Sequence, residues 1–593
     1  MSIMDEINKA PISGGIAVTA SAGTGKTYSL TKKIEDCVAK GINPINMLVF
    51  TFTTDAANEL KKRIGNAGSL MTVGTIHSVM LQIIREHGKK RYYVLDAGGQ
   101  LRFAFDILKD LKMDFDRANR YLGAIGFAKN KFTDYYDLLE NSPEFLEEFF
   151  GDKNLFSFAL EYERKKEHCH KIDFDDMTLK AFEILNNNPS ILDNRQERWK
   201  YIFVDEAQDL CQPQTDVIKL LARKYKNLFI VGDEKQAIYG SFRASSPEFL
   251  KNFKKEYPDA TIFNLPTTYR CCDAVCKAGN KIAQYIDKTI IDTANTELGS
   301  LITLSPFVNQ RDEAGDICDK AIAEFNAGRS VKILYRTNAQ SLVYQQIMLQ
   351  ENIPFSINQN TSIFQTKEAK LALACCSLAF EYDSLIQTSK ISCLMNLKPL
   401  LNNKWGLYAI TRKMKEADMC PFKNENKFMD DAKTADTLME IKYLRERFTE
   451  LKTIQDVFHY VAKVVEESDE NDFSDSAYDN LIGIEEFAAP CKNMQELNQF
   501  IEAISRPRLL ADGERAISLS TIHGSKGLEA DVVFLTGVVD GLLPHKNGED
   551  EEELNLFYVG VTRAKSELYV SGFMQFGRNT YEKFSYTGII AGG

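Results

Sequence analysis

The stretch GGIAVTASAGTGKTY, from Gly14 to Tyr28, decides the fold and the first candidate site. Its apolar run IAV predicts a buried strand, and the small residues after it predict a tight turn before a helix opened by Lys26 and Thr27. A strand, a glycine-rich turn and a helix N-terminus form a phosphate cradle, because backbone N–H groups point inward and the helix dipole favours an anion. Lys26 is then expected to reach the β- and γ-phosphates and Thr27 to hold Mg²⁺. Ala20 stands where the first glycine of the usual pattern belongs, so a flexible turn before a helix stays the alternative.

Length and composition bound the class of protein. With 593 residues, 44% of them hydrophobic and 26% charged, the chain is expected to form several globular domains. We see neither a secretory signal nor an apolar run near the roughly 20 residues that span a bilayer, so we expect a cytoplasmic protein without a membrane partner. The twelve cysteines include no CxxC pair, which argues against a disulfide framework or a zinc ribbon. The net charge of −11 excludes a wholly basic surface but leaves room for a local positive groove.

Two further apolar runs end in polar clusters typical of an α/β nucleotide site. KYIFV (200–204) is followed by Asp205 and Glu206, and LFIV (228–231) is followed by GDEKQ, which ends at Gln236. The carboxyl ends of parallel strands are where such sheets bind ligands. This pattern predicts Asp205 as a second Mg²⁺ ligand, Glu206 as the group that orients or deprotonates water, and Gln236 as a γ-phosphate sensor. Solvated strand caps are the alternative. The neighbouring pair Asp175 and Asp176 is expected to be structural.

The alternation of patterns predicts two α/β cores, each interrupted by a mainly helical insertion. The expected boundaries are 1–88 with 173–262 for the first core, 89–172 for its insertion, 263–366 with 512–593 for the second core, and 367–511 for the second insertion.

Nine motifs, in order, resemble the UvrD/Rep/PcrA group of superfamily 1 DNA helicases over nearly the whole chain. They are ASAGTGKT (20–27), TFTTDAANELKKRI (51–64), GTIHS (74–78), VDEAQD (204–209), VGDEKQAIYGSFR (231–243), TYR (268–270), LYRTNAQS (334–341), STIHGSKGLEADVVFL (520–535) and YVGVTRAK (558–565). The resemblance implies two RecA-like P-loop NTPase cores. The phosphate loop is more similar to the RecB/AddA branch, whose members carry a C-terminal nuclease. Only residues 566–593 follow Lys565, so we expect no nuclease domain here, and a nuclease in a separate partner chain stays an alternative.

The resemblance also implies roles for individual residues. Arg270 and Arg563 match arginines that the second core presents to the γ-phosphate, a task suited to a planar, permanently charged fork. Tyr269 matches an aromatic residue that stacks on adenine, and Glu529 a residue near the ribose. The implied catalytic residues are Lys26, Asp205, Glu206, Gln236, Arg270 and Arg563. The implied nucleotide-binding residues are Ala20, Ser21, Ala22, Gly23, Thr24, Gly25, Lys26, Thr27, Tyr28, Tyr269 and Glu529, with Thr27 and Asp205 on Mg²⁺.

Phe52, Thr53, His77, Tyr239 and Phe242 match positions that contact single-stranded DNA in the family. Aromatic faces stack on bases without reading their sequence, as a motor on DNA requires. Core packing is the alternative for the aromatic residues, and a structural role is the alternative for His77.

Three departures from the family pattern concern nucleotide choice and DNA contact. No glutamine precedes the phosphate loop in residues 1–19, and Tyr28 stands where arginine is common. Phe242 replaces a tryptophan, in a segment one residue longer than usual.

The resemblance implies an ATP-dependent DNA helicase or translocase that uses Mg²⁺ and moves 3′→5′ along single strands. We expect single-stranded DNA, single-strand/duplex junctions and repair or recombination proteins as partners, with unwinding in replication, repair or recombination. One alternative is a motor subunit that displaces proteins from DNA, or serves a recombination complex, with little unwinding of its own. Another is a nucleotide-switched binding protein, against which the complete set of catalytic residues argues.

Overall fold

The computed structural model describes residues 3–88, 90–113, 115–142, 144–357, 362–429, 431–468, 473, 476–505 and 515–591, without the side chains of residues 116, 242 and 591. The chain forms two compact units. Unit 1 comprises Met1–Ser300 with Asn547–Thr562, and unit 2 comprises Leu301–Lys546 with Arg563–Gly593.

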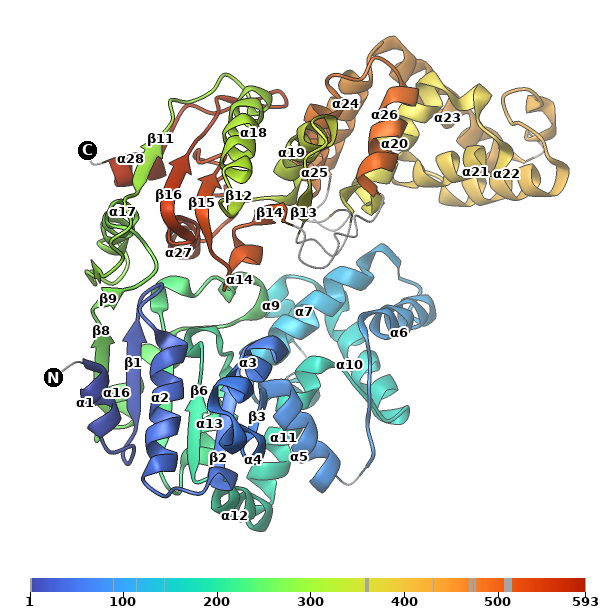
Figure 1. Cartoon of the computed structure of the whole chain (residues 1–593). Helices are drawn as coiled ribbons and strands as arrows, with labels where there is room; N and C mark the ends of the chain where they lie inside the picture. Colours follow the sequence, from blue (N-terminus) through green and yellow to red (C-terminus); the bar gives the residue numbers. More distant parts are fainter. Residues whose placement is uncertain are drawn as a thin grey trace. The chain divides into compact units, whose positions relative to one another are not determined.

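Unit 1 is built on a six-stranded sheet in the order β3-β2-β6-β7-β1-β8, in which every neighbouring pair is parallel (Figure 1). Val204 pairs with Ile230, and Thr19 pairs with Gly232. The carboxyl ends of β1, β6 and β7 therefore lie at one edge of the sheet, where the predicted nucleotide groups begin. The strands are β1 (Ile16–Ala20), β2 (Met47–Thr51), β3 (Thr72–Thr75), β6 (Tyr201–Val204), β7 (Leu228–Gly232) and β8 (Thr261–Leu265).

Helices cover both faces of this sheet, which explains the continuous apolar runs in its central strands. Ile16, Val18 and Phe229 pack on one face with α1 (Ile3–Lys9), α2 (Lys26–Ala39) and α3 (Thr54–Ile64). Ala17, Val204 and Ile230 pack on the other face with α5 (Ile76–His87), α11 (Phe174–Asn187), α12 (Pro189–Arg198) and α13 (Gln212–Ala222). The same core contains α15 (Glu248–Lys251) and α16 (Phe253–Glu256). Unit 1 also contains α4 (Asn66–Leu70), α14 (Gly240–Arg243), β9 (Thr267–Thr268), α17 (Asp273–Ala283), β10 (Asp292–Thr293) and α27 (Asp550–Val561).

Five helices interrupt unit 1 between the short strands β4 (Tyr93–Val94) and β5 (Lys171–Ile172). They are α6 (Ala97–Asp110), α7 (Ala118–Lys131), α8 (Tyr135–Asn141), α9 (Phe145–Phe150) and α10 (Lys153–His168), and they enclose a separate aromatic-rich core. The buried ammonium groups of Lys129 and Lys166 each contact Asp173 and Asp176 at 2.6–2.8 Å. Asp173 and Asp176 also form the capping box that begins α11. Asp176 thus ties the helical insertion to the core, which agrees with the structural role predicted for it.

Unit 2 contains a second six-stranded sheet, in the order β11-β16-β15-β12-β14-β13. The pairs from β16 to β13 are parallel, and α18 (Gln310–Asn326) and α19 (Ser341–Gln350) pack against the sheet. The strands are β11 (Ser300–Thr303), β12 (Val331–Tyr335), β13 (Phe355–Ile357), β14 (Ile517–Thr521), β15 (Ala530–Leu535) and β16 (Ala564–Val570). The chain after β16 forms β17 (Gln575–Phe576), β18 (Asn579–Thr580) and α28 (Ser585–Ala591).

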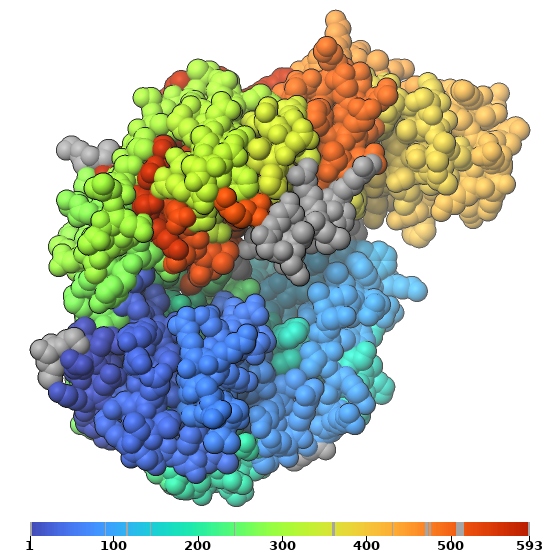
Figure 2. All heavy atoms as spheres, viewed as in Figure 1, coloured from blue at the N-terminus to red at the C-terminus, as the bar shows by residue number. Residues whose placement is uncertain are grey.

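A second helical insertion separates β13 from β14, and Figure 2 shows its yellow and orange residues as one close-packed body. Its helices are α20 (Lys367–Phe380), α21 (Gln387–Asn396), α22 (Lys404–Ala417), α23 (Ala432–Glu450), α24 (Ile454–Glu467), α25 (Ala477–Ala488) and α26 (Met494–Ser505). The two parallel sheets with helical insertions confirm the predicted fold class. The exact domain boundaries stay predictions. Within the described residues, no helix is long and apolar enough to cross a membrane.

Candidate nucleotide and DNA sites

The predicted phosphate loop joins β1 to α2 and requires glycine at two positions. Gly25 caps α2 with a left-handed backbone at φ 91°, and among the described residues no side chain accepts a hydrogen bond at this helix start. Gly23 also has a positive φ, of 74°. An added Cβ at residue 23 would lie 2.4 Å from the Cβ of Arg270 and 2.6 Å from the Oγ1 of Thr268. The glycines thus let the loop pass close to Thr268 and Arg270 and begin α2 without a side-chain cap, which leaves this helix N-terminus suited to an anion.

Thr27 and Asp205, the two predicted Mg²⁺ ligands, lie side by side. The Oγ1 of Thr27 donates a hydrogen bond of 3.3 Å to Oδ2 of Asp205, although 178 residues separate them. Burial and the neighbouring Glu206 raise the pKa of Asp205 to about 7, while the Lys26 ammonium acts in the opposite direction. A hydroxyl and a carboxylate are oxygen ligands that Mg²⁺ accepts. These residues fit a divalent cation beside the phosphate loop.

Glu206 follows β6 in a strained backbone conformation. Its φ of 51° and ψ of 48° are left-handed, which costs a non-glycine residue roughly 1–2 kcal/mol. Its backbone N–H donates to Oδ1 of Asp205 at 3.0 Å, and its Oε2 accepts a 2.6 Å hydrogen bond from Gln208. Such strain persists where the surrounding contacts hold it, commonly at functional sites. The position suits a group that must be held in one orientation.

Gln236 lies one turn after β7, and its Nε2 donates to Oδ2 of Asp233 at 2.7 Å. The backbone N–H of Asp233 donates to Oε1 of Gln208 at 3.0 Å. Gln208, which is fully buried, thus contacts both Asp233 and Glu206. One hydrogen-bonded network therefore connects the predicted water-activating residue to the predicted γ-phosphate sensor.

Tyr28 and Tyr269, the residues predicted to hold the base, line one cavity of about 480 Å³. Its apolar side is formed by Ile3, Met4, Leu265 and Pro266, and Thr267 and the phosphate loop complete the lining. The backbone N–H of Tyr269 donates to the carbonyl of Gly23 at 2.9 Å, so this predicted base pocket is attached to the phosphate loop. Both tyrosine rings are more than half exposed, at 52% and 69%. They are accessible for stacking on a nucleobase.

The structure places the two predicted arginines in different units. Arg270 lies in unit 1 beside Gly23, and its Nη1 donates to the carbonyl of Thr562 at 3.5 Å. Arg563 belongs to unit 2, where it is buried and donates to the carbonyl of Leu528 at 3.4 Å. Glu529, also in unit 2, pairs with Lys565 at 3.0 Å. Only Arg270 joins the phosphate-loop residues within unit 1, and the nucleotide contacts of Arg563 and Glu529 stay predictions.

Two of the predicted DNA-binding aromatic residues form a stack. The rings of Phe52 and Tyr239 lie 5.8 Å apart and are nearly parallel, at 7°. The guanidinium of Arg243 lies 5.1 Å from the centre of the Tyr239 ring and 6.0 Å from that of Phe52. Thr53 caps α3, because its hydroxyl accepts a hydrogen bond from the N–H of Ala56 at 3.1 Å, and its DNA contact stays a prediction. Phe242 falls in α14, but its side chain lies outside the described residues.

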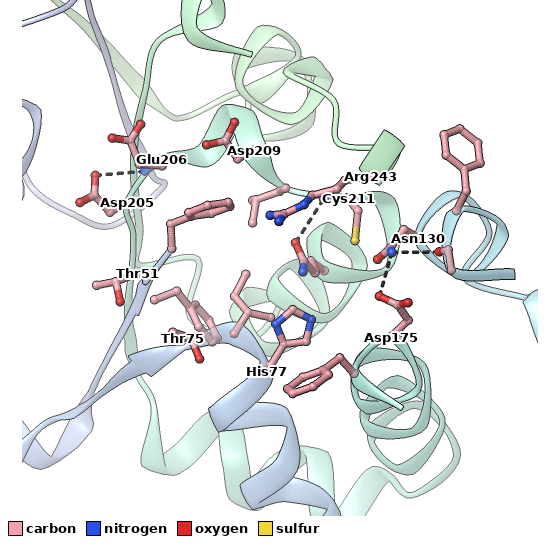
Figure 3. A pocket seen from close by; sticks show the side chains of 18 of the residues that line it. Thr51, Thr75, His77, Asn130, Asp175, Asp205, Glu206, Asp209, Cys211 and Arg243 are labelled. Carbon is pink, nitrogen blue, oxygen red and sulfur yellow. Dashed lines mark hydrogen bonds between the residues drawn. The ribbon is translucent and has the colours of Figure 1, made fainter. Parts of the chain in front are cut away.

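Phe52 and His77 also line a second cavity of about 480 Å³ (Figure 3). Figure 3 shows Asp205 and Glu206 at one side of this pocket and Asn130 and Asp175 at the other. Burial, and then the charge of Arg243, lowers the pKa of His77. The imidazole packs edge-on against Phe174, with ring centres 6.2 Å apart.

Several lining residues were not singled out from the sequence, among them Phe174, Arg243, Asn130 and Gln214. Phe174 is the first residue of α11, directly before Asp175 and Asp176, and no motif there indicates an exposed ring. Phe174 is nevertheless 51% exposed in the structure, which is unusual for phenylalanine, so the fold and not the sequence identifies it as a candidate.

The fold and site define this chain as a P-loop nucleoside triphosphatase. It combines a parallel sheet, a glycine loop at a helix N-terminus and an adjoining hydroxyl–carboxylate pair. The comparisons with known proteins narrow this class. The UvrD/REP helicase N-terminal domain matches residues 4–258, and the UvrD-like helicase C-terminal domain matches residues 263–575. The chain therefore belongs to the UvrD/REP helicase family, as its motifs predicted.

Individual relatives agree with this assignment. The chain is 28% identical to the ATP-dependent DNA helicase PcrA of Bacillus subtilis, over 94% of this chain and 80% of that protein. It is 27% identical to the proteins of the same name from Staphylococcus epidermidis and Staphylococcus aureus, over 95% of this chain and 82–83% of theirs.

Proposed function

We propose that this chain, an ATP-dependent DNA helicase of the UvrD/REP family, couples ATP hydrolysis to movement along single-stranded DNA. One observation carries the proposal. Asp205 and Glu206, which follow β6 beside the phosphate loop, also line the pocket that contains Phe52 and His77. A single strand of DNA in that pocket would contact the residues that prepare ATP hydrolysis. The DNA site and the ATP site would therefore have Asp205 and Glu206 in common.

The proposed chemistry assigns one task to each residue. Lys26 neutralises the β- and γ-phosphates, and Thr27 with Asp205 holds the cation. A Mg²⁺ ion held by these two residues would supply further charge compensation to the phosphates. Glu206 orients water and takes its proton, while Gln236 contacts the γ-phosphate. Arg270 and Arg563 stabilise the charge that develops in transfer, a contribution worth roughly 10³–10⁵ in rate for an arginine finger.

The proposed DNA contacts are made by Phe52, Tyr239 and His77, with Phe242 added by resemblance. Base–aromatic stacking contributes about 1–3 kcal/mol per base and accepts any sequence. Arg243 adds a positive charge next to the stacked rings, which suits the phosphate backbone. Single-stranded DNA and single-strand/duplex junctions are therefore the proposed substrates, with 3′→5′ movement. Repair or recombination partners and a cytoplasmic location stay predictions.

Unwinding of tailed duplexes tests this function. We expect ATP-dependent separation of a duplex carrying a 3′ single-stranded tail, and none of the same duplex carrying a 5′ tail. Equal unwinding of both would contradict the polarity. ATP-dependent displacement of a protein block from single-stranded DNA, without separation of either duplex, would favour the alternative motor that clears proteins.

A further inference from the structure

Lys235 is a buried cation in the turn that follows β7. Its side chain is 4% exposed, and its Nζ lies 2.7 Å from Oδ2 of Asp287 and 3.2 Å from Oδ1 of Asp233. The same ammonium lies 5.7 Å from the centre of the Tyr558 ring, on α27. Burial alone would lower the pKa of Lys235, but Asp233, Tyr558 and Asp287 raise it above its usual value. The side chain is therefore a fixed positive charge inside unit 1.

Asp233 links Lys235 to Gln236, the predicted γ-phosphate sensor. The carboxylate is 1% exposed, and while Oδ1 faces Lys235, Oδ2 accepts the 2.7 Å hydrogen bond from Gln236. Burial alone would raise the pKa of Asp233, but Lys235 and Lys26 hold it below its usual range. A buried carboxylate stays ionised only with such compensation. The ammonium thus keeps Asp233 available as an acceptor for the Gln236 amide.

The contacts around Asp233 leave little room for adjustment. Its backbone N–H is held by Gln208, which also contacts Glu206. A Cβ added to Gly232 would lie 2.6 Å from Oε1 of Gln208 and 2.9 Å from Cδ2 of Leu250. Because the backbone cannot shift on this side, the side chains of Asp233 and Gln236 would have to move if the Lys235 charge were lost.

We propose that Lys235 is a positioning residue for ATP hydrolysis, whose ammonium fixes Asp233 so that Asp233 fixes the Gln236 amide for the γ-phosphate. The inference rests on the proposed role of Gln236 in the preceding section. In this arrangement Lys235 acts on the γ-phosphate only through Asp233 and Gln236. Its effect is specific to the γ-phosphate and leaves ADP binding intact.

The test compares Lys235→Met with a matched surface variant, Lys251→Met. Lys251 is exposed, and its ammonium lies 3.5 Å from Oε1 of Glu551 on α27. The first readout is the ratio of affinities for a non-hydrolysable ATP analogue and for ADP, without DNA. The second is kcat for ATP in the presence of single-stranded DNA. Lys235→Met should lower the affinity ratio at least tenfold and kcat by on the order of 10², the size expected for a misplacement of about 1 Å. Lys251→Met should stay within twofold of the wild type on both.

If Lys235→Met alone fails to fold, a double variant without either charge of the Lys235–Asp233 pair provides the test. Asp233→Asn combined with Lys235→Met removes both buried charges, and the asparagine oxygen still accepts from Gln236. Recovery of the wild-type affinity ratio in this double variant would support the positioning role. A Lys235→Met affinity ratio and kcat within threefold of the wild type would overturn it, as would a double variant that binds ADP but keeps a lowered ratio. Absence of DNA-stimulated hydrolysis by the wild-type chain would refute the proposed function instead, because the affinity ratio needs no turnover.

Discussion

Replacement of Gly23 by alanine should reduce ATP turnover by displacing Arg270. The new Cβ would lie 2.4 Å from the Cβ of Arg270, whereas non-bonded carbons settle at about 3.5 Å, so one partner must move by about 1 Å. The left-handed backbone of residue 23 adds roughly 1–2 kcal/mol for any L-residue. Relief of the overlap adds about 1–3 kcal/mol. The free energy of unfolding should fall by the sum, about 2–5 kcal/mol. A catalytic group misplaced by 1 Å loses on the order of 10² in kcat.

Alanine substitutions at Gly25 and Gly41 separate the effect of backbone strain from the effect of the overlap with Arg270, because both glycines have a positive φ but lack that close contact. Gly25 has a φ of 91°, and its added Cβ would lie 3.8 Å from the Cβ of Tyr28. Gly41 has a φ of 85°, and among the described residues beyond its chain neighbours no atom lies within 4 Å of its added Cβ. Gly41→Ala should lower the melting temperature through strain alone and leave kcat unchanged. Gly25→Ala should show the same strain within the loop. Melting curves and steady-state ATP hydrolysis of the three variants measure both effects. The reasoning would be refuted if Gly23→Ala had the same melting temperature as Gly41→Ala and a kcat for ATP within threefold of the wild type.

Three further predictions concern the base pocket, the aromatic stack and a buried carboxyl. The described lining of the base pocket combines Tyr28, Tyr269, Thr24 and Thr267 with apolar residues and glycines, and it includes no charged or amide side chain. GTP should therefore support hydrolysis readily, and Tyr269→Ala should raise the KM for ATP and GTP by similar factors. A several-hundredfold preference for ATP in kcat/KM would contradict stacking as the main contact, since hydrogen bonds to a base edge discriminate far more strongly. Tyr239→Ala should weaken single-stranded DNA binding by about 1–3 kcal/mol and spare DNA-free ATP hydrolysis. An unchanged dissociation constant for oligo-dT would place Tyr239 outside the DNA path. Burial raises the pKa of Glu313 from 4.5 to about 7, so the folded state holds this proton more tightly than the unfolded state does. Stability should therefore fall as pH rises from 4.5 to 7, by about 3 kcal/mol in total, and level off above 7. Glu313→Gln should flatten this dependence in melting curves recorded across that range, and an unchanged slope would assign it to other groups.

The core of the nucleotide site could be predicted from the sequence because it lies at strand ends. Buried parallel strands read as continuous apolar runs, and the residues directly after them must gather at one edge of the sheet. That rule, together with the phosphate-loop pattern, predicted Thr27 and Asp205 at one Mg²⁺ site, and the structure shows the two in hydrogen-bond contact. Phe52 and Tyr239 were singled out only through the family resemblance, because local sequence patterns do not distinguish an exposed ring from a core ring. Their stacking on each other was not predicted.

Other features depend on packing that no local pattern records. The edge strand β8 is largely exposed, so TIFNL lacks a clear apolar signal, although it pairs with β1 along five residues. The need for glycine at position 23 comes from Arg270, which is 247 residues distant. Lys235 reads as an ordinary surface lysine within a polar turn. Only the fold brings Asp287 and Tyr558 to its ammonium.

The most direct test of the central claim is the rate of ATP hydrolysis by the full chain with and without single-stranded DNA. The shared wall of the phosphate site and the aromatic pocket predicts a rate that rises at least tenfold with saturating oligo-dT. Glu206→Gln should bind ATP and remain inactive under both conditions, because it keeps the phosphate loop and loses the proposed base. A wild-type rate unaffected by DNA, or a Glu206→Gln rate close to the wild type, would contradict the account.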